Sequence, residues 1–279
     1  MSPRTTIESW ARILWLSKYS KENLIALLCA AYFDASGRKD YPVMSVGGAI
    51  APVYKWVRFE QEWCAALKEE GVSEFHATDF AAGKGAFKNW DKPRRGRFLK
   101  TLGVILNTRV NKFFCASIES EAWESVNKEY LLQECFHSQY ALCGFAVVKQ
   151  ILQWEKRHRS REVKIFFEKG DPGWGGVERL CEGIGVNPIP LPKKEAVPFQ
   201  ASDLIAWKSR IAFTNGLKKF NQFMAMQEPT ILEIEGMIAE EESLKKIMVK
   251  PGTPGVFSRS ALLDNCVKFK IPRRPLGKE

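Results

Sequence analysis

The chain has 279 residues, of which 45% are hydrophobic and 12% aromatic, and its formal net charge is +10 at pH 7. This hydrophobic content excludes a disordered chain and predicts either one large domain or a domain with an appendage. The basic charge predicts a nucleic-acid partner, the alternative being a basic face that is merely solvated.

No apolar run is long enough for a membrane span, so we expect no membrane partner. The best candidate, residues 24–33, has about half of the roughly 20 residues that a span needs. Lys18, Lys21 and Glu22 precede it, which is not the pattern of a signal peptide. The seven cysteines are scattered and form no Cys-x-x-Cys pair, which excludes a disulfide framework and a zinc ribbon. We therefore expect a soluble, cytoplasmic protein.

The first half of the chain predicts a hairpin followed by helices and a strand. Residues 1–23 read as an N-terminal arm. The apolar residues 29–34 predict a first strand, and the turn residues 35–37 allow a second strand over 41–50 to pair with it as a hairpin. The elements expected next are helices over 56–71 and 94–107 and a strand over 110–118.

The second half continues the alternation and then changes in character. Its expected elements are a helix over 136–154, a strand over 164–168, a glycine-rich turn over 170–176 and a helix over 200–214. Mixed alternation of this kind predicts an α/β protein with a sheet flanked by helices. Asn215-Gly216 is expected to break the last helix. We therefore expect a core over 24–216 and, over 217–279, a helical appendage with a basic tail.

Three carboxylates lie where elements of the predicted sheet end. Asp34 ends the first strand, Glu168 ends the strand over 164–168, and Asp203 lies in the first turn of a helix. Strand ends in an α/β sheet open onto a common edge, so these side chains can converge. Clustered carboxylates repel one another unless a cation neutralises them, and hard oxygen ligands suit Mg²⁺ or Mn²⁺. The pattern predicts a metal site with these three residues as ligands.

Each candidate also has an ordinary explanation when it is taken singly. Asp34 could accept a bond from an amide in the following turn, and Asp203 could serve the helix N-terminus. Glu168 could lie at a solvated strand end, and His76 could be a packed histidine. Asp171, before Pro-Gly, fits a turn residue better than a ligand.

Four segments together resemble the domain-of-unknown-function 3800 family. They are residues 32–37 (Tyr-Phe-Asp-Ala-Ser-Gly), 74–77 (Glu-Phe-His-Ala), 165–168 (Ile-Phe-Phe-Glu) and 200–206 (Gln-Ala-Ser-Asp-Leu-Ile-Ala). The resemblance covers roughly residues 28–212, with the segments in the family's order. It implies a ribonuclease H-like fold, a mixed sheet flanked by helices, whose carboxylates hold divalent metal ions.

The resemblance also implies roles for individual residues. By position, the catalytic acids are Asp34, Glu74, Glu168 and Asp203, and the accessory residues are His76 and Gln200, with Asp171 as a further accessory candidate. The chain departs from the family pattern at three positions. Ala35 stands in place of Glu, Ser202 in place of Ala, and Glu168 where Asp is commoner. The change at position 35 removes one possible metal ligand.

These observations predict a metal-dependent phosphodiesterase, a nuclease acting on DNA or RNA with Mg²⁺ or Mn²⁺. Arg94, Arg95 and Arg97 form a basic cluster that we expect to hold the nucleic-acid backbone. The alternative is a non-catalytic module of the same fold that binds nucleic acid or another partner without metal. A small-phosphoester hydrolase is a third hypothesis.

Overall fold

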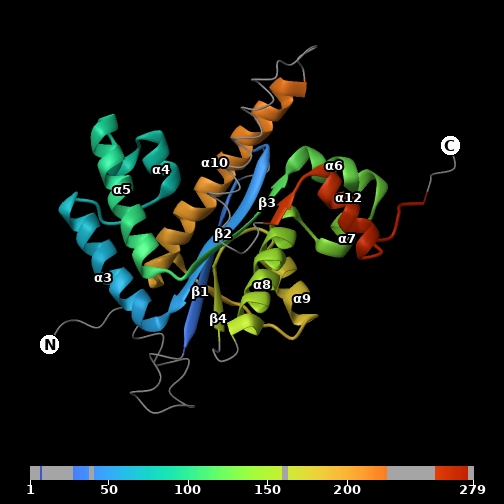
Figure 1. The fold of residues 1–279 in the computed structure, drawn as a ribbon, viewed down its shortest axis with the longest axis horizontal. Helices are drawn as coiled ribbons and strands as arrows, with labels where there is room; N and C mark the ends of the chain where they lie inside the picture. Colours follow the sequence, from blue (N-terminus) through green and yellow to red (C-terminus); the bar gives the residue numbers. More distant parts are fainter. Residues whose placement is uncertain (1–6, 8–27, 38–40, 159–162, 225–254, 276–279) are drawn as a thin grey trace.

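The computed structural model describes residue 7 and residues 28–37, 41–158, 163–224 and 255–275 (Figure 1). Most of the N-terminal arm predicted over 1–23 lies outside these residues. Within the described ranges, no helix is both long and apolar enough to cross a membrane.

A six-stranded mixed sheet forms the centre of the molecule, in the order β5-β4-β1-β2-β3-β6. The strands are β1 (Cys29–Ser36), β2 (Val43–Pro52), β3 (Lys112–Glu119), β4 (Val163–Glu168), β5 (Ile189–Leu191) and β6 (Gly255–Phe257). β2 is antiparallel to β1 and β3, and the other neighbouring pairs are parallel. The predicted α/β class with a mixed, helix-flanked sheet is confirmed. Without the edge strand β6, the order is β3-β2-β1-β4-β5, which is that of a ribonuclease H-like sheet.

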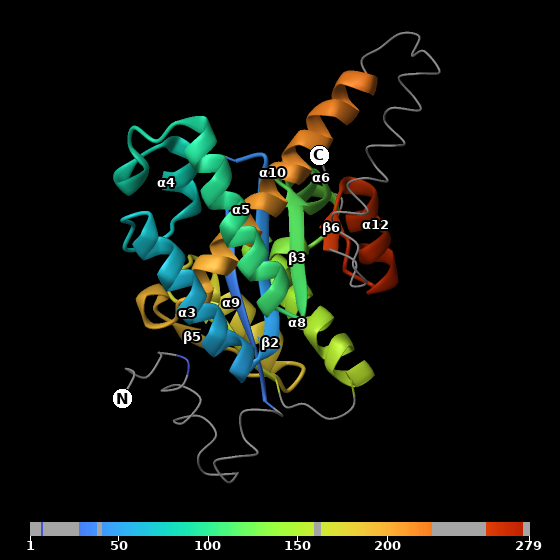
Figure 2. The same cartoon turned by 60° about the vertical axis from the view of Figure 1, so that its left-hand side comes forward.

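Helices cover both faces of this sheet (Figure 1). One face carries α3 (Val53–Glu69), α4 (Ala77–Ala82), α5 (Lys92–Arg109) and α10 (Pro198–Met224). The other carries α6 (Ser120–Glu129), α7 (Leu132–Phe136), α8 (Gln139–His158), α9 (Trp174–Glu182) and α12 (Arg259–Lys268). Figure 2 shows β6 and α12 beyond β3, at one edge of the sheet.

The alternation of side chains in β1 builds both halves of the core. Tyr32 faces the α10 side and stacks on Phe166 with ring centroids 4.9 Å apart. Phe33 faces the α8 side and stacks on Phe167 at 5.3 Å. Because successive strand residues point to opposite faces, Asp34 shares the face of Tyr32. The sequence of β1 therefore directs Asp34 toward α10.

The expected helix break at Asn215-Gly216 is wrong, because α10 continues to Met224. A glycine inside a helix costs only about 1 kcal/mol relative to alanine. Phe213 and Leu217, four residues apart, are both half-buried, so the helix face on either side of the glycine still packs. In the range 217–279, the described residues comprise the end of α10, strand β6 and helix α12. The division into core and appendage stays a prediction.

Candidate active site

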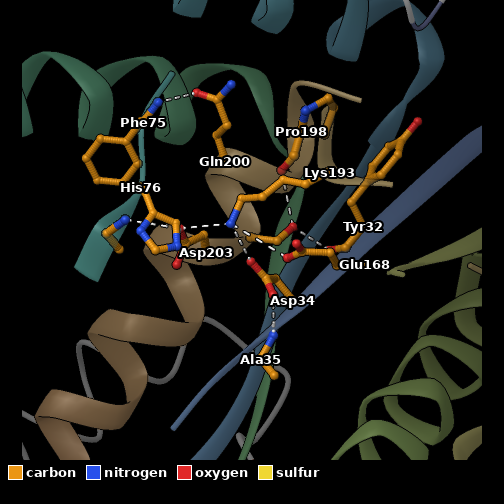
Figure 3. Close-up of polar contacts among 12 residues, drawn as sticks. Tyr32, Asp34, Ala35, Phe75, His76, Glu168, Lys193, Pro198, Gln200 and Asp203 are labelled. Carbon is orange, nitrogen blue, oxygen red and sulfur yellow. Dashed lines mark hydrogen bonds and ion pairs between the residues drawn. The ribbon is translucent and has the colours of Figure 1, made fainter. Parts of the chain in front are cut away.

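Adjacent parallel strands bring the first two carboxylates together. β1 and β4 pair with Phe33 opposite Phe167, so Asp34 and Glu168 follow at neighbouring positions on one sheet edge. Asp203 joins them from α10, which crosses the same face (Figures 1 and 3). The predicted convergence of these three side chains is present in the structure.

Gly47 is the reason that α10 can lie so close to the sheet. It pairs with Asp34 across the β1–β2 ladder. A Cβ atom at this position would be 2.8 Å from the backbone N and Cα of Ala206. The absence of a side chain at Gly47 and the small side chain of Ala206 thus set the approach of α10, and with it the position of Asp203.

The ammonium of Lys193 lies among the three carboxylates (Figure 3). Its Nζ atom is 3.0 Å from Oδ2 of Asp203, 3.2 Å from Oδ2 of Asp34 and 3.6 Å from Oε2 of Glu168. The side chain of Lys193 is 15% exposed and that of Asp34 only 5%. Lys193 comes from a short 3-10 helix, η2 (Lys193–Glu195), that follows β5. A nearly buried cation position therefore exists, and a side chain of the protein fills it.

Electrostatics at the site show an excess of negative charge. Burial raises the pKa of Asp34 well above its usual value, the Lys193 ammonium lowers it, and Glu168 and Asp203 raise it further. Burial alone would lower the pKa of Lys193, but the charges of Asp34, Asp203 and Glu168 raise it above its ordinary value. One ammonium faces three carboxylates, so the site favours additional positive charge.

Backbone N–H groups hold two of the carboxylates independently of Lys193. The amide of Ala35 donates to Oδ1 of Asp34 at 2.6 Å, and the amide of Ala77 donates to Oδ2 of Asp203 at 3.0 Å. The first bond is local to β1, and the second ties Asp203 on α10 to the first residue of α4. The arrangement of the acids thus has supports other than the ammonium.

The departures from the family pattern at positions 35 and 202 have structural explanations. Ala35 points to the opposite face from Asp34 and packs against the apolar cluster on the α8 side. A glutamate there would not face the three carboxylates. Ser202 is fully buried, and its Oγ donates to the carbonyl of Tyr32 at 2.8 Å, which ties α10 to β1.

Gln200 anchors the loop before α4. Its Oε1 accepts hydrogen bonds from Trp63 Nε1 and from the amide of Phe75, both at 2.9 Å. The next residue in that loop, His76, is about half exposed, with Nε2 3.9 Å from Oδ2 of Asp203 and Nδ1 3.3 Å from Oδ2 of Asp79. Of the three accessory residues predicted from the sequence, His76 lies at the rim beside Asp203 and Gln200 ties the loop to α10.

Glu74 lies in the same loop but is exposed. Within the described ranges, no hydrogen bond or ion pair joins it to Asp34, Glu168 or Asp203. The structure thus brings together three of the four predicted catalytic acids and leaves the fourth at the surface.

Asp171 lies close enough to the cluster to be affected by its charge. Burial, followed by the negative charge of Asp34, raises the pKa of Asp171 to about 6. Its neighbour Tyr140 also has a raised pKa, through burial and the charge of Asp171. The Oδ2 of Asp171 and the hydroxyl of Tyr140 are both buried without a hydrogen bond of normal geometry in the described part of the chain. From the sequence, Tyr140 is expected only to be part of the apolar face of a helix.

We expect Asp171→Asn to stabilise the protein at neutral pH. The pKa of Asp171 is about 6 in the folded protein and 3.8 in an ordinary aspartate, so folding disfavours the ionised carboxylate. The free energy of unfolding should therefore fall as the pH rises from about 4 through about 6. The substitution should raise the free energy of unfolding at pH 7 by about 1–3 kcal/mol. Urea denaturation at pH 7 and at about pH 4 measures this, and the gain should vanish at the lower pH. An equal gain at both pH values would contradict the prediction.

The predicted nucleic-acid cluster lies on α5, where two of its arginines make structural contacts. Arg94 pairs with Glu70 at 2.8 Å, and its Cζ lies 4.0 Å from the centre of the Trp90 ring. Arg95 is half-buried beside Gly83. Arg97 is exposed. Of the three, Arg97 is therefore the one most available to a phosphate.

A different arginine stands at the edge of the site. Nε of Arg210 on α10 donates to Oγ of Ser36 at 3.0 Å, and its Cζ lies 4.6 Å from the centre of the Tyr41 ring. Ser36 is two residues beyond Asp34 on β1. Arg210 follows Asp203 by two helical turns, and this spacing is the signal in the sequence that could have identified it.

The donor atoms at the site suit a divalent metal ion. All are carboxylate oxygens, the ligands that Mg²⁺ and Mn²⁺ prefer, and the Lys193 ammonium marks where a cation is stabilised. As they stand, the described residues include no group of three or more His, Cys, Asp or Glu side chains arranged to hold a metal ion. The chemistry of the site thus fits a metal, and Lys193 fills the space between the donors.

Comparisons with known proteins give little beyond this geometry. No family model matches the chain, and no curated protein matches it either. Among solved structures, it is similar to a chain of the PCNA:RNase HII complex from Archaeoglobus fulgidus. The two are 13% identical with a TM-score of 0.39, and the match covers 81% of this chain and 94% of that chain. The fold class is therefore assigned from the strand order, and the proposed chemistry from the geometry of the candidate active site.

Proposed function

We propose that this protein is a divalent-metal-dependent phosphodiesterase that cleaves DNA or RNA. The observation that carries the proposal is the convergence of Asp34, Glu168 and Asp203, from two strands and a helix, around one cation position. The resemblance of four segments to the domain-of-unknown-function 3800 family supports the same assignment. The net charge of +10 supports an anionic substrate.

The three carboxylates would hold Mg²⁺ or Mn²⁺. Such an ion, when bound, polarises a phosphoryl oxygen and lowers the pKa of a water molecule. The amides of Ala35 and Ala77 keep Asp34 and Asp203 oriented toward it. Preorganised ligands of this kind avoid the cost of rearrangement when substrate binds.

Other side chains at the rim would act on the substrate itself. Arg210 is placed to contact a phosphate, since its guanidinium is held by Ser36 and Tyr41. The His76 imidazole is half exposed, with Nε2 3.9 Å from Oδ2 of Asp203, and is placed where a substrate could contact it.

The proposal is tested by cleavage of single- and double-stranded DNA and RNA with Mg²⁺ or Mn²⁺ and with chelator. We expect metal-dependent cleavage that falls about 100-fold or more in Asp203→Asn, because one ligand carboxylate is lost. Asp264→Asn, an exposed change on α12, is the matched control and should cleave like wild type. Cleavage that resists the chelator or survives Asp203→Asn would contradict the proposal.

The second candidate is a binding module without catalysis, and Lys193 is the observation that favours it. An ammonium that stays among the carboxylates would neutralise part of their charge without metal. Binding to nucleic acid that weakens with salt, needs no metal and leads to no cleavage would support this candidate.

A further inference from the structure

The contacts of Lys193 are those of a counter-ion whose ammonium another cation can displace. Among the described residues, its Nζ makes polar contacts with Asp34, Glu168 and Asp203 and with no other group. Lysine carries its charge on a flexible four-carbon stem, so the ammonium can move while the backbone stays in place. Its backbone belongs to the three-residue helix η2, close to the chain turn that begins α10.

Two of the three carboxylates are held by groups other than Lys193. Asp34 is held by the amide of Ala35, and Asp203 by the amide of Ala77. The pairing of β4 with β1 places the backbone of Glu168 next to that of Asp34. The acids can therefore stay together in two states, one with the ammonium between them and one with another cation there.

The charge balance favours the second cation. Three carboxylates and one ammonium leave a net negative charge at a site where Asp34 is 5% exposed. A divalent cation in place of the ammonium brings more positive charge to the same oxygens. The displaced ammonium would then lie at the site entrance, next to any bound phosphate.

We propose that Lys193 is a displaceable internal counter-ion: it occupies the cation position in the metal-free protein, competes with the divalent ion and is released when that ion binds. This inference rests on the proposed function, since it takes the same three carboxylates as metal ligands. It assigns to Lys193 a positioning role, in which it keeps the acids from repelling one another before metal arrives. It also implies that metal affinity in wild type is weaker than the carboxylates alone would give.

The first test is calorimetric titration of Mn²⁺ into the wild-type protein and into Lys193→Met. Without the competing ammonium, we expect the variant to bind Mn²⁺ about tenfold more tightly or better. Lys194→Met is the matched control, because Lys194 is the neighbour on η2 that makes no contact with the three acids, and its affinity should equal that of wild type. An unchanged or weaker affinity in Lys193→Met overturns the inference.

The second test uses the wild-type protein alone and so does not depend on a folded variant. Reductive methylation followed by mass spectrometry measures how accessible each lysine amine is. Lys193 should react slowly without metal, because its side chain is only 15% exposed, and several-fold faster with saturating Mg²⁺, because release exposes the amine to the reagent. Lys194 should react equally in both conditions. Protection of Lys193 that persists in Mg²⁺ overturns the inference.

The outcomes separate this inference from the proposed function. If wild type binds Mn²⁺ and Lys193→Met binds it no better, the counter-ion role fails and the metal site stands. If Lys193→Met binds Mn²⁺ and wild type does not, Lys193 blocks the site permanently, so both its release by metal and a metal-dependent activity of wild type are refuted. If neither protein binds Mn²⁺, both proposals fail.

Discussion

Asp34→Asn should abolish metal-dependent cleavage without unfolding the protein. Asp34 is the most buried of the three carboxylates and lies within 3.2 Å of the cation that now occupies the site. Asparagine keeps the shape and one oxygen but removes the charge, so we expect cleavage to fall about 100-fold or more.

The same substitution should leave the midpoint of thermal unfolding unchanged or raised. Burial raises the pKa of Asp34, which means that folding disfavours its ionised form. Removing that buried charge offsets the lost ion pair with Lys193. Cleavage assays and thermal unfolding of the same sample measure both effects, with Asp264→Asn as the control. A large fall in the unfolding temperature would show that the acid serves the fold, and full cleavage would show that it serves neither metal nor catalysis.

Gly47→Ala should destabilise the protein, although it adds only one methyl group. The new Cβ would lie 2.8 Å from backbone atoms of Ala206, which cannot move without shifting α10. Overpacking of this kind costs about 1–3 kcal/mol. Because α10 carries Asp203, the shift should also weaken the site, and cleavage should fall together with stability.

Gly103→Ala is the matched control for this prediction. Gly103 lies in α5, and a Cβ there would meet nothing within 4 Å. Alanine is the better helix former, so this variant should be stabilised by up to about 1 kcal/mol. Urea denaturation of both variants measures the contrast. Equal stabilities for the two would contradict the role assigned to Gly47.

The sequence was sufficient to predict four of the six strands, β1 to β4, and the convergence of three of the acids, but not β5 or β6. Apolar runs ending in Asp34 and Glu168 mark strand ends, and neighbouring strand ends meet at one edge whatever the details of packing. Asp203 could be added because Pro198 marks the start of its helix. These are local signals, and they need no knowledge of long-range contacts.

The parts of the site that depend on long-range contacts could not be predicted. Lys193 is 159 residues from Asp34 in the chain, and in the sequence it is one of two lysines in a polar turn. The sequence pattern shows Arg94 and Arg95 as a free basic cluster, because their partners, Glu70 and the carbonyl of Phe80, lie 24 and 15 residues away in the chain. The helix continues through Gly216 to Met224, since a single glycine costs a helix only about 1 kcal/mol relative to alanine.

A crystal structure of the protein grown with Mn²⁺ tests the central claim most directly. The anomalous signal of Mn²⁺ locates the ion without reference to any assumed function. We predict a peak between the carboxylates of Asp34, Glu168 and Asp203, with the Lys193 ammonium withdrawn from all three. Carboxylates that still contact Lys193, with no anomalous peak among them at saturating Mn²⁺, would contradict the account.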